Sequence, residues 1–161
     1  MRTTTIPLLT SKPVPVIGTG AMPLSNARDD GTTMPLDEAV AVLHHAFDAG
    51  LRLVDTADIY APSASEVGHN ERLVGEAVRT WAGGRDLIVV VTKIGITRTP
   101  GPPESEWGRD GSRDYLLRAA EASATALVFE PDVILNHLVN RAQQPYAETV
   151  RGMLATTRTF A

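Results

Sequence analysis

The hydrophobic positions of the chain follow two alternating periods. Over residues 36–49, apolar side chains recur every three or four positions, which is typical of a helix with one buried face. Asp37 and Glu38 begin this segment and Gly50 follows it, as expected for the acidic first turn and the glycine end of a helix. The period and the boundary residues therefore predict the same amphipathic helix.

Three further segments carry helical patterns. They cover residues 70–81, 112–127 and 146–154. Asn70 and Ser112 are expected to cap the first two helices, because a side-chain oxygen at this position accepts a bond from a free backbone N–H. The third segment follows a proline, which favours the first turn of a helix.

Short runs rich in Val, Ile and Leu lie between the helical segments, at residues 14–18, 51–55, 87–92 and 132–136. The third run is apolar nearly throughout, which is typical of a strand buried on both faces of a parallel sheet. Strands that alternate with helices predict parallel strands joined by right-handed crossovers. We therefore expect an α/β fold of four strand-helix units, forming one domain over residues 1–161.

Two other segments need a separate interpretation. Residues 3–12, which a proline interrupts, predict a short hairpin ahead of the first strand. Residues 96–111 are rich in Pro and Gly, and loops of this length in compact domains are usually functional or mobile. We expect this loop to form the rim of a binding site, with Trp107 as a candidate aromatic residue of the substrate pocket.

Composition narrows the possible partners. The net charge is -4 and the fifteen Lys and Arg residues are scattered, which argues against nucleic acid. Without cysteine the chain has no disulfide framework or thiolate metal site, and His44 and His45 are neighbours that face different directions on a helix, so no metal site is expected. The N-terminus lacks the apolar run of about 7 or more residues that a signal peptide requires, and no stretch approaches the roughly 18 apolar residues of a membrane span. We expect a cytoplasmic protein that acts on a small molecule.

Four polar residues fall at the carboxyl ends of the expected strands. Asp55 ends the second strand, Tyr60 lies in the loop that follows, Lys93 ends the third strand and His137 ends the fourth. In a parallel barrel this edge carries the functional side chains. Each residue alone has an ordinary explanation, as a turn cap, a solvated cation, a rim aromatic or a core histidine. Their common edge favours a shared acid-base site.

Five segments resemble the aldo-keto reductase family. They are IGTGAM at residues 17–22, GLRLVDTADIY at 50–60, GHNERLVG at 68–75, VTKIG at 91–95 and VILNH at 133–137. The resemblance runs in register and implies the N-terminal half of a TIM (β/α)8 barrel. It also implies reduction of an aldehyde or ketone with NADPH.

The resemblance implies a role for each residue of the site. Tyr60 would be the general acid, Lys93 would favour its phenolate and Asp55 would hold Lys93 by an ion pair. His137 would orient the substrate carbonyl. The cofactor would lie against Gly20, Ala21, Met22 and Asp55.

The sequence also departs from the family. Ala61 stands where the family usually has a glycine after the tyrosine, and four strand-helix units replace the eight of a closed barrel, so most of the family's cofactor-binding residues are missing. Open sheet edges predict a homodimer or a heteromer that buries them. Three alternatives to a reductase therefore stay open: a cofactor-independent acid-base enzyme (isomerase, dehydratase or cyclase), a non-catalytic binding or assembly module, and a truncated product without a function of its own.

Overall fold

The computed structural model describes residues 2–6, 10–26, 28 and 31–137. Its centre is a four-stranded sheet in the order β3-β4-β5-β8, in which all neighbours are parallel. The strands are β3 (Thr19–Gly20), β4 (Leu53–Asp55), β5 (Val89–Ile94) and β8 (Val133–Asn136). The α/β fold expected from the sequence is thereby confirmed.

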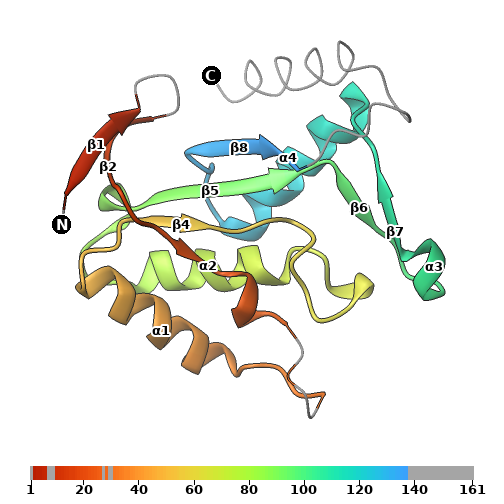
Figure 1. The fold of residues 1–161 in the computed structure, drawn as a ribbon, viewed down its shortest axis with the longest axis horizontal. Helices are drawn as coiled ribbons and strands as arrows, with labels where there is room; N and C mark the ends of the chain where they lie inside the picture. Colours follow the sequence, from red (N-terminus) through yellow and green to blue (C-terminus); the bar gives the residue numbers. More distant parts are fainter. Residues whose placement is uncertain (1, 7–9, 27, 29–30, 138–161) are drawn as a thin grey trace.

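Three long helices connect the strands: α1 (Leu36–Asp48), α2 (His69–Thr80) and α4 (Arg113–Leu127). They lie along the sheet, with α2 packed between α1 and α4 (Figure 1). All three agree with the predicted helical segments, whereas the helix predicted at residues 146–154 lies outside the described residues. Short 3-10 turns occur at Met22–Leu24, Ala64–Glu66 and Arg85–Leu87. None of the described helices combines the length and apolar character that a membrane span requires.

The two faces of the sheet bury different residues. Val54 and Val90 belong to the core shared with the helices, whereas Val89 and Val91 pack with Val14 on the opposite face. This alternation follows from the two-residue period of a strand. Both faces of the central strands are therefore covered, as expected for parallel strands.

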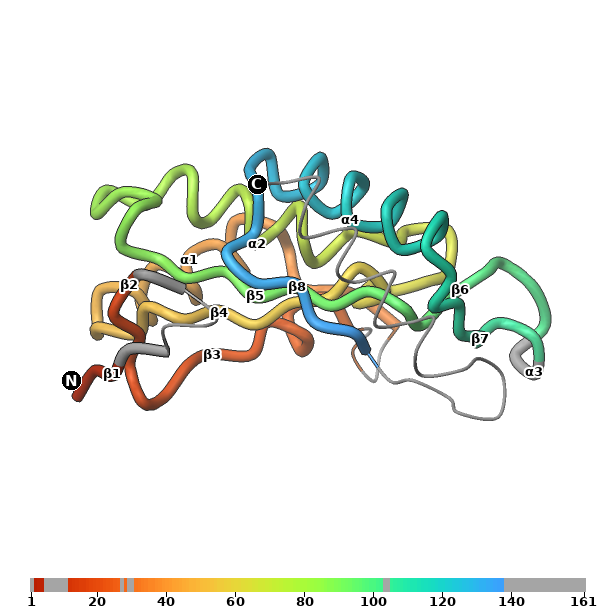
Figure 2. Tube along the Cα trace, turned by 90° about the horizontal axis from the view of Figure 1, so that it is seen from above, coloured from red at the N-terminus to blue at the C-terminus, as the bar shows by residue number. Residues whose placement is uncertain are grey.

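The cover on the second face is an N-terminal hairpin. Strands β1 (Thr3–Ile6) and β2 (Thr10–Pro15) pair antiparallel and lie across the sheet from α2 and α4 (Figure 2). The hairpin predicted near the N-terminus is confirmed. Lys12 fastens it, because its ammonium lies 2.7 Å from Asp132 Oδ1 and 3.1 Å from the Ile88 carbonyl oxygen.

The strand predicted at residues 14–18 is wrong. Val14 belongs to the hairpin, Val16 and Ile17 are exposed, and the parallel edge strand is β3. The start of the apolar run belongs to the hairpin and not to the parallel sheet. Gly18 lies close to β4, because a Cβ atom at this position would lie only 2.4 Å from Leu53 Cδ2.

The segment predicted as a loop at residues 96–111 contains regular structure. Strands β6 (Ile96–Arg98) and β7 (Trp107–Arg109) form an antiparallel pair around the short helix α3 (Pro103–Glu106). Arg98 holds it in place: its Nε lies 2.5 Å from Glu106 Oε1 and its Nη1 donates to the Ala61 carbonyl at 2.6 Å. The rim segment is thus tied to the loop that carries Tyr60.

Candidate active site

Parallel pairing brings the carboxyl ends of the strands to one edge. Asp55 of β4 pairs with Val91 of β5, and Lys93 of β5 pairs with Leu135 of β8. His137 follows β8, and its backbone N–H donates to the Ile94 carbonyl at 2.7 Å.

Lys93 lies at the centre of this edge. Its ammonium contacts Asp55 Oδ1 at 2.5 Å, the Thr56 carbonyl oxygen at 2.8 Å and the Tyr60 hydroxyl oxygen at 3.1 Å. These contacts use the three donors of an ammonium group. The Lys93 side chain is 15% exposed, so solvent screens the interaction with the Tyr60 oxygen only weakly. The ammonium also lies 4.7 Å from the centre of the Tyr60 ring.

His137 stands next to Tyr60. The two rings meet edge to face, with 5.8 Å between their centres and 87° between their planes. Burial and the nearby Lys93 charge lower the pKa of His137 below its usual value, although Asp55 opposes them. The imidazole is therefore neutral at neutral pH, and its buried Nδ1 has no hydrogen-bond partner among the described residues.

A hollow of about 510 Å³ opens beside these two rings, a volume that is typical of a small-molecule site. Its walls come from the Tyr60 loop, the β6–β7 hairpin and the turn after β3, and include Met22, Ile59, Tyr60, Arg98, Trp107 and His137. Trp107 is half exposed, with the Arg98 guanidinium 4.8 Å from the centre of its ring. The sequence-predicted pocket aromatic thus lies in the wall next to the acid-base cluster.

The turn after β3 forms the other side of the edge. Gly20 pairs with Asp55 across the strands, and the Ala21 N–H donates to the Asp55 carbonyl at 2.8 Å. Met22 is 43% exposed and lines the hollow. The structure thus brings together all seven residues expected at the site from the sequence, together with Trp107.

Asn70 is a site-supporting residue with a different role from the predicted one. The α2 N-cap is Gly68, with φ 83°, and the Asn70 side chain does not cap the helix. Asn70 is fully buried and bonds Thr56 Oγ1 at 2.7 Å, the Ala21 carbonyl at 2.8 Å and Ser25 Oγ at 2.7 Å. It therefore joins the turn after β3 to the end of β4. The local sequence indicated only a cap, because the partners of this side chain are distant in sequence.

The fold and the cluster define a class of α/β protein with Tyr, Lys, Asp and His at the carboxyl edge of a parallel sheet. Residues 16–157 match the model of the Aldo/keto reductase family, and the chain belongs to this family. The resemblance found in the sequence motifs is confirmed.

Similar proteins include two reductases. L-glyceraldehyde 3-phosphate reductase of Escherichia coli (strain K12) is 32% identical over 125 residues, which cover 76% of this chain and 34% of that protein. Versiconal hemiacetal acetate reductase of Aspergillus parasiticus is 28% identical over 147 residues, which cover 83% of this chain and 41% of that protein. The chain spans less than half the length of each.

The fold is also similar to that of solved structures. An aldo-keto reductase from Bacillus halodurans, solved in its holo form, matches with a TM-score of 0.76 at 24% identity, over 99% of this chain and 47% of that one. At this identity the likeness establishes the α/β fold of the aldo-keto reductase barrels, and nothing about substrate.

Proposed function

We propose that the protein reduces a small aldehyde or ketone with NADPH, using Tyr60 as the general acid. One observation carries this proposal: the Lys93 ammonium lies 3.1 Å from the Tyr60 oxygen and 2.5 Å from Asp55. When Tyr60 gives its proton to a developing alkoxide, a phenolate remains, and an adjacent cation stabilises it. Asp55 keeps that cation in place.

His137 orients the substrate carbonyl in this proposal. A neutral imidazole donates one ring N–H to an oxygen without adding a second positive charge beside Lys93. The lowered pKa of His137, caused first by burial and then by Lys93, supports the neutral form. The hollow of about 510 Å³ holds the substrate, with Trp107 as one wall.

The residues proposed to hold NADPH are Gly20, Ala21, Met22 and Asp55. A Cβ atom at Gly20 would meet nothing within 4 Å, and Met22 is exposed beside Tyr60, so a flat ring can approach this edge. NADPH, when bound, supplies the hydride for the carbonyl carbon. The residues of the chain bind and orient the carbonyl and deliver the proton from the Tyr60 hydroxyl.

We also propose that the four parallel strands form the first half of an eight-stranded barrel, completed by a partner chain in a homodimer or heteromer. Among the described residues, β3 and β8 each pair on one side only. Open edges of parallel strands leave backbone donors and acceptors unpaired, which favours pairing with another strand.

The experiment that tests the reductase is a pair of NADPH measurements on wild type and Tyr60→Phe. NADPH should raise the melting temperature of both proteins, because a ligand that binds the folded state stabilises it. Oxidation of NADPH by small aldehydes should fall at least about 100-fold in Tyr60→Phe, the usual effect of removing a general acid. The matched control is Ser63→Ala, which removes a hydroxyl bonded to Glu66 and should keep full activity.

Two results would contradict the proposal. If millimolar NADPH shows no change in fluorescence on mixing with the protein and leaves the melting temperature of the protein unchanged, a reductase is excluded. Equal turnover by wild type and Tyr60→Phe would exclude Tyr60 as the acid while leaving hydride transfer in place.

A further inference from the structure

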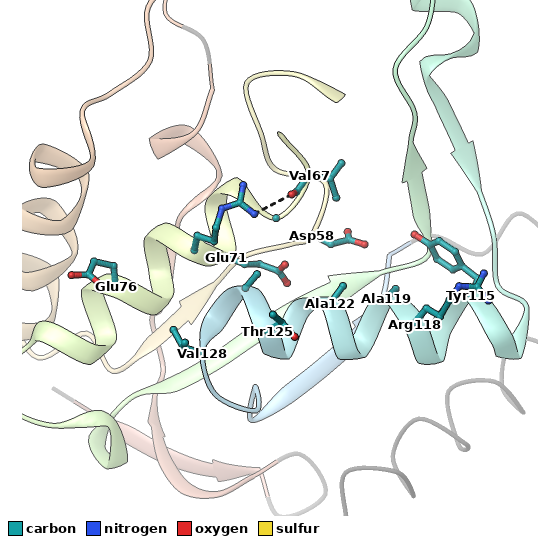
Figure 3. A pocket seen from close by; sticks show the side chains of 13 residues that line it. Asp58, Val67, Glu71, Glu76, Tyr115, Arg118, Ala119, Ala122, Thr125 and Val128 are labelled. Atoms are coloured by element: carbon teal, nitrogen blue, oxygen red, sulfur yellow. Dashed lines mark hydrogen bonds between the residues drawn. The ribbon is translucent and has the colours of Figure 1, made fainter. Parts of the chain in front are cut away.

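A second hollow lies outside the proposed active site, between α2 and α4. Its volume is about 740 Å³, within the range of small-molecule sites. Much of its wall is apolar and comes from small side chains of α4, among them Ala119, Ala122 and Ala126 (Figure 3). Both bordering helices belong to the described part of the chain.

Asp58 lines this hollow, and its buried carboxyl is the observation that suggests a ligand. The residue is only 7% exposed, and its Oδ1 has no hydrogen-bond partner among the described residues. In folded proteins nearly all buried polar groups are paired, since an unpaired one loses the free energy of its hydration. In Figure 3 the Asp58 carboxyl is directed along the hollow, toward the end where Tyr115 lies.

Glu71 places a second carboxyl at the same floor. It is 1% exposed, and its Oε1 accepts a bond from Thr92 Oγ1 at 2.5 Å. Burial, followed by the nearby Glu71, raises the pKa of Asp58 to about 8. A cation bound between the two carboxyls would offset the repulsion that Glu71 exerts on an ionised Asp58.

The arginines around the hollow do not supply that charge to Asp58. Arg72 donates to the carbonyl oxygens of Val67 at 3.3 Å and Glu66 at 3.4 Å, so its guanidinium is held by the loop before α2. Arg118 is exposed on α4. Within the described residues, no ion pair joins either side chain to Asp58.

We propose that this hollow binds a small organic cation, a primary alkylammonium whose charged head lies against Asp58 and whose apolar chain lies along the alanines of α4. The ammonium donates to the Asp58 carboxyl, and a charge-assisted bond of this kind is stronger than a neutral one. The short alanine side chains leave room for the alkyl chain, which gains from the burial of apolar area.

The charge at Asp58 makes binding depend on pH. The charged or titratable groups that face it are Glu71 and Arg72 of α2, Lys93 of β5, and Tyr115 and Arg118 of α4. Burial raises the pKa of Tyr115 above its usual value, so it stays neutral, and an alkylammonium stays charged below about pH 9. Affinity should therefore rise about tenfold from about pH 7 to about pH 9, as Asp58 ionises.

The test is a calorimetric and NMR titration of the protein with n-butylammonium chloride, with n-butanol as the uncharged probe. Saturable binding of the ammonium, at least about tenfold tighter than that of the alcohol, is expected. Asp58→Asn should weaken binding at least about tenfold and reduce the pH step, which Glu71 can still contribute to because burial raises its pKa as well. The matched control Glu76→Gln, which neutralises a carboxylate at the edge of the same hollow, should change the affinity little because that carboxylate pairs with Arg79.

A second variant locates the site independently. Ala122→Phe adds a ring at an exposed α4 position that lines the hollow, and it should abolish binding without disturbing the core. Any of four results would overturn the proposal: unchanged binding in this variant, no saturable binding by wild type, equal affinity for the alcohol, or a pH step of undiminished size in Asp58→Asn. All of these readouts are independent of NADPH, so a failed reductase assay leaves the proposal intact.

Discussion

Among single residues, Lys93 determines the chemistry of the edge. Its ammonium is shared among a carboxylate, a backbone carbonyl and a phenol oxygen, so the position of the charge is fixed from three directions. Since a cation stabilises a phenolate only at short range in a poorly solvated place, this fixed position matters more than the charge alone.

Asp58 gives a prediction at the same scale. Its pKa is raised from 3.8 to about 8, mainly by burial, so between about pH 4 and pH 8 the folded state binds more protons than the unfolded state. The free energy of unfolding should therefore fall as pH rises through this window and level off above it. Urea denaturation across this range should show the slope in wild type.

The matched variant is Asp58→Asn, which keeps the shape of the side chain and removes its charge. It should show a flatter profile than wild type and greater stability at about pH 8, by an amount on the order of several kcal/mol at most, given the size of the shift. Identical pH profiles in the two proteins would mean that Asp58 does not titrate in this window.

Among the elements, α2 and α4 approach each other unusually closely. A Cβ atom on Gly75 would lie 2.4 Å from the Leu127 carbonyl oxygen. This oxygen belongs to the backbone, so it cannot rotate away as a side-chain atom could. Helix propensity alone favours Gly75→Ala by about 1 kcal/mol. We predict the opposite sign, a loss of about 1–3 kcal/mol from overpacking, measured by chemical denaturation. A stabilised variant would show that the helices can separate freely.

The elements also differ in how far sequence could predict them. The helix over residues 36–49 was predictable because its period and its boundary residues are local signals. The apolar run at residues 14–18 was not, since hydrophobicity does not distinguish a hairpin strand from a parallel one. Asn70 carries the local signal of a cap, but its side chain is used by Ala21 and Thr56, which are distant in sequence. The carboxyl-edge cluster was predictable because parallel strand ends meet at one edge, whereas burial of Asp58 depends on α4.

For the whole molecule, the edge strands β3 and β8, which pair on one side only among the described residues, give a prediction about assembly. β8 bonds β5 on one side, and Leu135 on this strand is 39% exposed. We expect light scattering at micromolar concentration to find a dimer or larger assembly, because an open parallel edge pairs readily with another strand. The substitution Leu135→Lys should shift the assembly toward monomer. A monodisperse monomer of the wild-type protein would contradict the predicted assembly.

The hairpin β1–β2 has a consequence for the order of folding. Lys12 bonds a carbonyl 76 positions away, and its ion pair reaches Asp132 on the last described crossover. The hairpin leaves the ribosome before the strands that it contacts, so its contacts form only when β5 and the segment before β8 have been synthesised. Contacts between distant positions form slowly because a long loop must close. The hairpin residues, although made before the sheet strands that they contact, are thus fixed only when those strands are in place, and they cover one face of the sheet.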